Sequence, residues 1–359
     1  MKRSRDLGLF KSHLPTGRYN SITDIKNLLV GYKTIYQKPN ASDKNLIRSG
    51  VTIVLPKGRE KMPTPTWAGS FALNGNGEMT GTHWINDGGY FVGPIAITNT
   101  HSVGIVHHSV TKWMINQYKR YWTNNHLWAM PVVCETYDGV LNDINSQPIK
   151  ESHVFEAFRD AKSGKIKEGN VGGGTGMICY EFKGGTGTSS RIIKINKKKY
   201  TIATLVQANH GIRPWLTVDG KKVGNKSTRN RLIEDESGAK ERGSIIVLVA
   251  TDAPMLPHQL KRIAKRAAIG IGRTGTPGGN NSGDIFLAFS SANISNIPQL
   301  DNNFGNMDFI NDELFDDFYL ATVESTEESI INAMLAAKDT ISIRPKGHLV
   351  SSLKPSDLA

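Results

Sequence analysis

Residues 242–254 read Arg-Gly-Ser-Ile-Ile-Val-Leu-Val-Ala-Thr-Asp-Ala-Pro, so that Gly243-Ser244 leads directly into the most apolar run of the chain. A Gly-Ser pair before an Ile/Val run is typical of a turn that enters a buried strand. The pair also allows a chemical interpretation, because a cut between Gly243 and Ser244 would leave a serine with a free α-amine. That amine has a reference pKa of about 7.7–8.0 and can accept the hydroxyl proton near neutral pH. The stretch therefore predicts a core strand that begins either at a structural turn or at an N-terminal nucleophile.

The segment just before this strand differs from the rest of the chain, because residues 217–242 are polar and charged with little apolar periodicity. Such a composition is typical of a surface loop. We expect residues 217–242 to form a mobile loop, which would let a new chain end at Gly243 swing clear of the pocket after a cut.

Apolar runs and helical patterns alternate along the chain. Runs typical of buried strands occupy residues 51–55, 95–100, 201–207, 245–250 and 285–290. Helical patterns occupy residues 103–121, 154–161, 256–268 and 325–337. Ser325 and Glu328 form a candidate capping box at the start of the last pattern. Strands that are apolar throughout are typically covered on both faces, so the alternation predicts a layered α/β body.

The composition limits the class of protein. The chain has 359 residues, enough to bury a large core in one layered unit, and two cysteines, Cys134 and Cys179. Two cysteines without zinc-site spacing predict neither a disulfide framework nor a zinc centre. The N-terminal residues lack the apolar core of a signal peptide, and no apolar run approaches the roughly 18 residues of a membrane span. We expect a soluble, cytoplasmic protein that does not bind membranes.

The net charge of +12 raises the alternative of a basic binding module for nucleic acid or other acidic partners. The basic residues are scattered in short runs such as Lys197–Lys199, however, and no run is interleaved with aromatic residues that could stack on bases. Lys197–Lys199 lies between two strand-like runs, which is typical of a solvated hairpin turn. We therefore expect no nucleic-acid binding.

Three local motifs resemble functional sites but lack the required context. Gly270–Gly275 spells GxGxxG, yet it follows a basic helical pattern where a dinucleotide site needs a strand. Gly220–Ser227 resembles a phosphate-binding loop with the wrong spacing. His101, His107 and His108 cluster in sequence without a metal-site pattern or nearby carboxylates. None of these motifs predicts a nucleotide or metal site, and no GxSxG motif supports an α/β-hydrolase.

Strings rich in Gly, Asn and Ser recur between these elements. Six of them match, in order, strings of the DmpA/BapA family of self-processing aminopeptidases, which the chain resembles: residues 74–81, 99–104, 172–177, 184–191, 243–254 and 282–293. The resemblance implies a four-layer αββα sandwich of the N-terminal-nucleophile type. It further implies a single catalytic domain over residues 1–359 that cuts itself into a large chain, 1–243, and a small chain, 244–359. No metal or organic cofactor is implied, and the processed pairs are expected to form a tetramer.

The resemblance also assigns roles to single residues. Ser244 corresponds to the nucleophile, which first cuts its own bond to Gly243 and then attacks substrate. Asn209 matches an amide that resembles an oxyanion-hole donor, and Tyr137 matches a phenol at the same pocket. Glu135 matches the carboxylate that binds the free ammonium of the substrate, and it shares a face with Tyr137 if this segment is extended. A substrate without that charge would leave a buried Glu135 unpaired, which gives aminopeptidase specificity a physical cause.

Ser282 and Asp284 match a pair that the family places beside the nucleophile to orient it and its amine. The β-aminopeptidase pattern has Glu where this chain has Asp284, whose side chain has less reach. Without the resemblance, the two residues are typical of a turn that opens the strand at residues 285–290. Two proton acceptors stay open, namely the Ser244 α-amine and a relay through Ser282.

Together these observations predict a serine aminopeptidase with an N-terminal nucleophile. It would release α-L-, D- or β-amino acids from short peptides, amides or esters through an acyl-enzyme on Ser244. One alternative is an acyl transferase resembling ornithine acetyltransferase, which would be expected to use Thr where this chain has Ser244. The other is the basic binding module, which two fragments of the purified chain on a denaturing gel would oppose.

Overall fold

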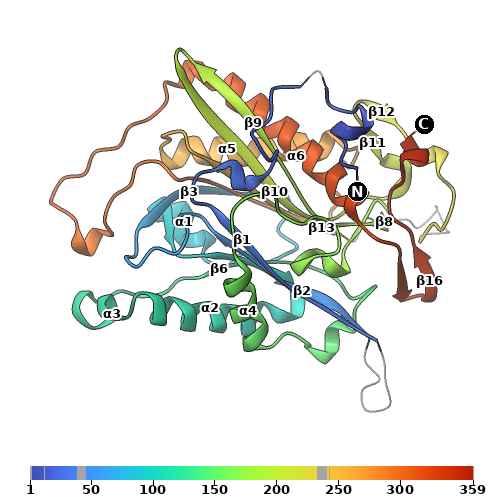
Figure 1. Ribbon diagram of the computed structural model, residues 1–359, viewed down its shortest axis with the longest axis horizontal. Coiled ribbons are helices and arrows are strands. Elements are labelled where there is room, and N and C mark those ends of the chain that lie inside the picture. Colours follow the sequence, from blue (N-terminus) through green and yellow to red (C-terminus); the bar gives the residue numbers. More distant parts are fainter. Residues whose placement is uncertain (1, 12, 39–45, 233–240, 242, 359) are drawn as a thin grey trace.

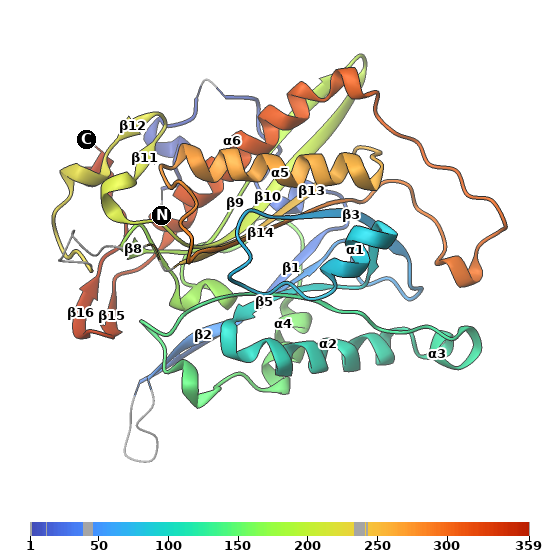
Figure 2. The ribbon, with the colours of Figure 1, turned by 180° about the vertical axis from the view of Figure 1, so that it is seen from behind.

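The chain folds into four layers, with two β-sheets packed face to face between two layers of helices, as Figures 1 and 2 show from opposite sides. This computed structural model describes residues 2–11, 13–38, 46–232, 241 and 243–358. The layers follow the order helix, sheet, sheet, helix, which confirms the predicted αββα sandwich.

The first sheet has four strands in the order β1-β2-β5-β6. These strands are β1 (Leu29–Gln37), β2 (Ile47–Leu55), β5 (Ile95–Asn99) and β6 (Val132–Thr136). Pairing is antiparallel except between β5 and β6, which are parallel. Their carboxyl ends, Asn99 and Thr136, are register partners, so the residues that follow them lie at the same edge of the sheet.

The second sheet has six strands in the order β4-β3-β14-β13-β10-β9. These strands are β3 (Pro65–Ala72), β4 (Tyr90–Val92), β9 (Gly185–Ile195), β10 (Lys198–Asn209), β13 (Ser244–Thr251) and β14 (Gly283–Ser290). The central strands β13 and β14 are parallel, whereas β10 runs antiparallel to β13. The starts of β13 and β14 therefore lie beside the end of β10.

Helices cover the outer face of each sheet. Figure 1 shows α2 (Val103–Gln117) and α4 (Glu151–Asp160) below the four-stranded sheet, with α3 (Lys119–Asn125) continuing from α2. On the opposite side, α5 (Pro257–Arg273) packs on β3 and β14, and α6 (Asp316–Ala336) packs on β9 and β10. The short α1 (Thr82–Gly88) packs against β3 and β4.

Three hydrophobic clusters fill the spaces between the layers, and β13 contributes to two of them. Ile245, Val247 and Val249 face the cluster under α5 and α6. Ile246 and Leu248, with Ala250, face the cluster between the two sheets. Because side chains alternate along a strand, a strand that is apolar on both faces must be covered on both faces. The third cluster joins the four-stranded sheet to α2 and α4.

The predicted core strands are all present, and each is contained in β2, β5, β10, β13 or β14 apart from the last residue of 95–100. The helical pattern at residues 103–121 is divided between α2 and α3. The predicted capping box is wrong, because α6 begins at Asp316, ahead of Ser325. Ser325 is buried in the helix, and its hydroxyl donates to the Thr322 carbonyl oxygen at 3.2 Å. Serine makes such bonds in helix interiors as well as at caps, which explains the error.

The predicted loop at residues 217–242 is partly structured. β11 (Thr217–Val218) and β12 (Lys221–Lys222) form a hairpin, and Val218 and Val223 are buried in the main core. These two valines are too few to give a visible periodicity, so the sequence did not reveal the hairpin. Residues 233–240 and 242, which complete the predicted loop, lie outside the described residues.

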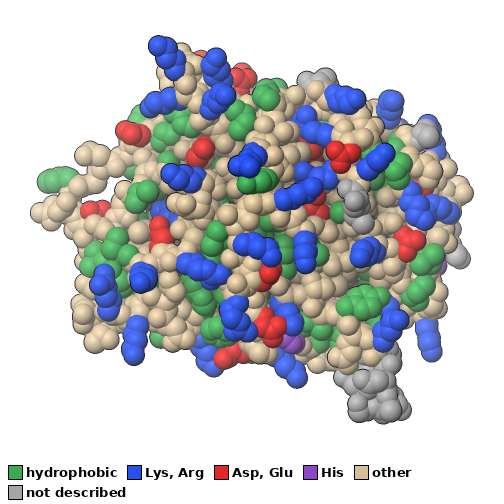
Figure 3. Space-filling model, in the orientation of Figure 1, with side chains coloured by type: hydrophobic (Ala, Val, Ile, Leu, Met, Phe, Trp, Pro, Cys, Tyr) green, Lys and Arg blue, Asp and Glu red, His purple; other side chains and the backbone are tan. Residues whose placement is uncertain are grey.

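Two further short hairpins complete the structure. They are formed by β7 (Ile178–Cys179) with β8 (Phe182–Lys183), and by β15 (Thr340–Ile343) with β16 (Lys346–Val350). On the face shown in Figure 3, Lys and Arg side chains are spread over the surface with Asp and Glu between them. Both cysteines are buried as free thiols. Among the helices described, none combines the length and apolar character that a membrane span requires.

Candidate active site

Ser244 and Asn209 meet across the sheet. Ser244 is the first residue of β13 and Asn209 the last of β10, and the two are register partners in this antiparallel pair. Directly opposed side chains in such a pair have Cβ atoms about 4.5–5.5 Å apart. Both side chains fall on the face turned toward the other sheet, because Ile246 and Leu205, two and four residues away, belong to the cluster between the sheets. Ser244 is 5% exposed. The fold thus brings a serine hydroxyl and an amide together at one end of the inter-sheet layer.

The backbone of Gly283 faces the Gly243–Ser244 bond. Gly283 is the parallel register partner of Ser244. Its N–H lies 3.3 Å from the Gly243 carbonyl oxygen and 3.3 Å from Ser244 Oγ. A donor in this position can stabilise negative charge that develops on the Gly243 carbonyl oxygen. Sequence reasoning missed this group, because a backbone N–H has no residue-specific signal.

Only glycine fits at position 243 with the backbone as it lies. A Cβ there would be 1.9 Å from the Asn209 carbonyl oxygen and 2.6 Å from the His210 Cα. Any larger residue would push the Gly243–Ser244 bond away from β10. The Gly-Ser pair therefore has a packing cause as well as a chemical interpretation.

The Asn209 side chain is fixed by the backbone on both sides. Its Nδ2 donates to the Tyr137 carbonyl oxygen at 3.0 Å, and its Oδ1 accepts the Ile178 N–H at 2.8 Å. A primary amide has two N–H groups, so one donor is left for a ligand after the bond to Tyr137. The arrangement suits an oxyanion donor of defined orientation.

The Tyr137 backbone contacts Asn209, and its phenol lies beside Gly139. The ring lies against Gly139, where an added Cβ would be 2.3 Å from the hydroxyl oxygen, and the side chain is 37% exposed. The structure therefore brings the Tyr137 carbonyl to Asn209 but leaves the hydroxyl turned toward Gly139.

Ser282 and Asp284 flank Gly283 and are bonded to each other. Ser282 Oγ donates to Asp284 Oδ1 at 2.6 Å, and both side chains are buried. Burial and, to a smaller extent, the negative charge of Glu241 raise the pKa of Asp284 to about 6, although hydrogen bonds from Ser282 and Asn74 oppose the shift. Asp284, although shorter than glutamate, therefore reaches Ser282. The protonation state of Asp284 changes within about one pH unit of neutrality.

Glu135 lies on the other side of the same backbone. A Cβ on Gly77 would be 3.2 Å from Glu135 Oε1 and 3.4 Å from the Gly283 Cα, so the carboxylate is close to the start of β14. Its Oε1 accepts the Glu78 N–H at 2.9 Å, and its Oε2 accepts a hydrogen bond from the Thr100 hydroxyl. Burial raises the pKa of Glu135, and these hydrogen bonds partly oppose that effect. Glu78 and Thr100 were not predicted as site residues, although both lie inside the matched strings at residues 74–81 and 99–104.

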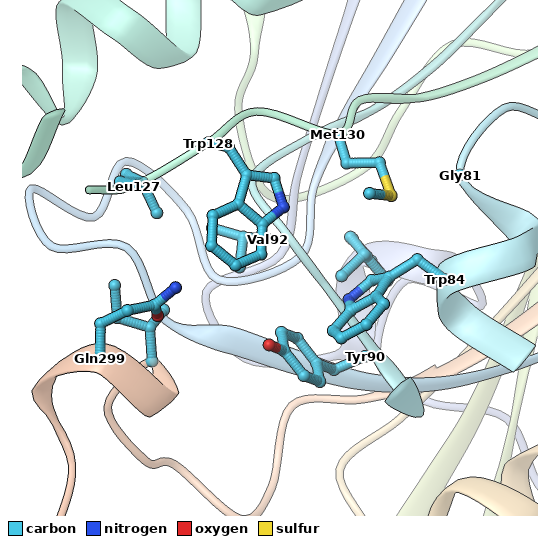
Figure 4. Close-up of a pocket in the computed structure, with 10 residues that line it drawn as sticks. Gly81, Trp84, Tyr90, Val92, Leu127, Trp128, Met130 and Gln299 are labelled. Atoms are coloured by element: carbon cyan, nitrogen blue, oxygen red, sulfur yellow. The ribbon is translucent and has the colours of Figure 1, made fainter. Parts of the chain in front are cut away.

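No group of three or more His, Cys, Asp or Glu side chains within the described ranges could hold a metal ion. The described residues do form an aromatic pocket, which is shown in Figure 4 with Trp84, Tyr90 and Trp128 around it. Tyr90 of this pocket is the register partner of Trp67, near the start of β3. The other end of β3 lies near Asp284, because the N–H of Leu73, just after β3, donates to the Asp284 carbonyl oxygen. Six residues of strand separate these points by on the order of 20 Å, so the aromatic pocket is remote from Ser244.

The chain is similar to known proteins over nearly its whole length. The model of a family described as Peptidase family S58 matches residues 20–347. A β-peptidyl aminopeptidase from Sphingosinicella microcystinivorans is 44% identical over 99% of this chain and 90% of its own length.

Solved structures are similar as well. L-aminopeptidase D-Ala-esterase/amidase from Ochrobactrum anthropi, described as a prototype of the serine aminopeptidases with a variant of the Ntn hydrolase fold, matches with a TM-score of 0.94. It is 50% identical, and the match covers 100% of this chain and 97% of that one. A β-aminopeptidase from Burkholderia sp. matches with a TM-score of 0.88 and 40% identity, over 99% and 97% of the two chains.

Proposed function

The chain belongs to peptidase family S58, and from this membership we propose that it is a serine aminopeptidase that matures by cutting its own Gly243–Ser244 bond. The products would be a large chain, residues 1–243, and a small chain that begins with Ser244. The observation that carries the proposal is the position of Ser244 at the start of β13, opposite Asn209 and beside the Gly283 N–H.

The first cut needs a proton acceptor other than the Ser244 nitrogen. In the unbroken chain that nitrogen is part of a peptide bond and has no basic lone pair. We assign the first step to the Ser282–Asp284 pair, supported by their 2.6 Å hydrogen bond and by a pKa of about 6 for Asp284, which leaves this acid ionised at neutral pH. Ser282 would pass the proton from the Ser244 hydroxyl toward Asp284.

The bonds change in two stages. Ser244 Oγ attacks the Gly243 carbonyl carbon, the C–N bond breaks, and the departing nitrogen takes up a proton to become the Ser244 α-amine. Water then hydrolyses the ester between Gly243 and Ser244, which gives a Gly243 carboxylate and restores the hydroxyl. The Gly283 N–H and the free N–H of Asn209 would stabilise the oxyanion in both stages.

Turnover of substrate would follow the same route with the new amine as base. The α-amine of Ser244 takes the hydroxyl proton and later gives it to the leaving amine of the substrate. Glu135 would bind the ammonium of the substrate, because it is a buried carboxylate held by two hydrogen bonds close to Gly283. This arrangement favours substrates with a free N-terminus, of the α-L, D or β class. The tetramer of processed pairs and the cytoplasmic location expected from the sequence form part of the proposal.

Intact mass of the purified protein tests the first half of the proposal. We expect wild type to give two chains divided after Gly243, and Ser244→Ala to give one chain of 39.4 kDa. A wild-type chain that stays whole while hydrolysing substrate at full rate would contradict the proposal. Activity on α-L-, D- and β-alanyl p-nitroanilides, with the N-acetylated forms as controls, tests the second half. Equal rates of hydrolysis for the free-amine and the N-acetylated p-nitroanilides would contradict the proposed binding of the substrate ammonium by Glu135.

A further inference from the structure

Glu241 is a buried carboxylate close to the bond that is cut, and the mechanism above gives it no task. It lies three residues before Ser244 and is 4% exposed. Its Oε1 accepts the Gly211 N–H at 2.6 Å. Its Oε2 accepts the Thr276 hydroxyl and the Gly279 N–H, each at 2.9 Å. Charge-assisted hydrogen bonds of this kind are stronger than neutral ones, so the side chain is firmly held.

Two glycines make room for this carboxylate. A Cβ at Gly279 would lie 2.6 Å from Glu241 Oε2, so no other residue lets the backbone approach so closely. Gly211 has a φ of +82°, which disfavours a side chain at the turn that supplies the other N–H. The pocket is therefore shaped to receive an acid at position 241.

The same turn holds the Ser282–Asp284 pair. The Gly279 N–H donates to Glu241, while the Gly279 carbonyl oxygen accepts the Ser282 N–H at 2.9 Å. Ser282 in turn donates its hydroxyl to Asp284. One peptide segment thus links the chain before the cut to the pair assigned to accept the proton.

The Gly243–Ser244 bond is consequently fixed on both sides. Ser244 is held by the pairing of β13 with β10 and β14. Glu241 is only two residues from Gly243, a span of at most about 7 Å. The Gly243 carbonyl, which Ser244 would attack, is therefore confined between strand β13 and the buried side chain of Glu241.

We propose that Glu241 is a positioning residue for maturation, which docks the chain before Gly243 onto the Thr276–Ser282 turn and so aligns the Gly243 carbonyl with Ser244 and Ser282. The inference rests on the proposed self-cleavage. Glu241 forms no bond to the reacting atoms, and its effect is to keep the unbroken chain in a reactive geometry. Displacement by about 1 Å can cost on the order of 100-fold in rate, so a lost anchor should slow the cut strongly.

The rate of conversion of full-length precursor into two chains tests this role. We expect Glu241→Ala to slow conversion about 10- to 100-fold at pH 7.5. Thr276→Val, which removes one donor, should slow it several-fold, and Thr276→Ser, which restores the hydroxyl, should return it to within about twofold of wild type. Glu327→Ala is the matched control, because Glu327 is another buried carboxylate, on α6, that pairs with Arg273 of α5 instead of with the Thr276–Ser282 turn. It should convert like wild type.

Stability is measured separately, by thermal unfolding of each variant combined with Ser244→Ala, so that every chain remains whole. A Glu241→Ala chain that is folded at the assay temperature and converts within twofold of wild type would overturn the inference. If Glu241→Ala does not fold, equal conversion of Thr276→Val and Thr276→Ser would overturn it instead. Failure of the proposed self-cleavage has a different signature, because wild type would then also stay uncut.

Discussion

Replacing Asp284 with asparagine should make the stability of the folded chain rise, relative to the aspartate chain, as the pH increases. Asp284 is 1% exposed, and burial is the largest cause of the rise in its pKa from 3.8 to about 6. A folded state that holds a carboxylic acid at a raised pKa prefers the protonated form. Its stability is therefore greatest below pH 3.8 and falls as the pH rises through about 6. Asparagine has nearly the same shape and no charge, so the variant escapes this loss.

The magnitude follows from the two pKa values. A shift of about 2 units corresponds to about 3 kcal/mol between the fully protonated and fully ionised forms. At pH 5 roughly half of that destabilisation is already present, and a further ~1.4 kcal/mol is added between pH 5 and pH 8. The advantage of Asp284→Asn over aspartate should thus grow by about 1.4 kcal/mol over this interval. Any cost of replacing the acceptor of the Ser282 and Asn74 hydrogen bonds is the same at both pH values and cancels.

Urea unfolding followed by tryptophan fluorescence provides the assay. Both chains carry Ser244→Ala, so that self-cleavage does not create a second species, and free energies come from linear extrapolation at pH 5 and pH 8. Buried acids that do not interact with Asp284 titrate identically in the two chains and drop out of the comparison. An advantage that stays constant between pH 5 and pH 8, or that shrinks, would show that Asp284 is not held at a raised pKa. The reasoning for its part in the first cut would then fail too.

Three further changes follow from the same contacts. Glu135→Gln should raise KM for free-amine substrates about 30-fold or more while kcat changes little, because a buried charge pair is worth about 2–5 kcal/mol; an unchanged KM in steady-state kinetics would refute this. Asn209→Ala should lower kcat about 10²- to 10³-fold, measured on chain that has already matured, since it removes one oxyanion donor. Arg191→Met should cost about 3–5 kcal/mol in urea unfolding, because it leaves Glu324 and Glu328 buried without the guanidinium that now lies 2.9 and 2.8 Å from them. A loss below 1 kcal/mol would mean that other groups compensate both acids.

Several parts of the site could be predicted because their signal is local. The Ile245–Ala250 run shows by its apolar character on both faces that it is covered on both sides, and this predicts a central strand. Ser244, Ser282 and Asp284 lie in strings that match the family, and Asn209 was proposed from the same resemblance. The resemblance of those strings to a family also predicted the order of the four layers. The alternation of strand and helix patterns along the chain predicted only a layered α/β body.

Other parts depend on contacts between distant segments. The Gly283 N–H was missed because a backbone donor is the same for every residue type, and only the parallel pairing of β13 with β14 aims it at Gly243. The contact of the Tyr137 carbonyl with Asn209 was likewise not visible in the sequence, whereas a role for the phenol stays a prediction. Such a contact depends on tertiary packing.

The sequence by itself determined which strand lies at the centre, that Ser244 stands at the start of that strand, and to which family the chain belongs. Tertiary structure alone decided that Glu241, in a segment that looks like solvated loop, is buried against Gly211, Thr276 and Gly279. The physical reason is that apolar periodicity indicates burial of hydrocarbon, whereas this buried acid is held by donors that lie 30 residues before it and 35 and 38 residues after it. Those donors become neighbours when β10, β13 and β14 pair into one sheet.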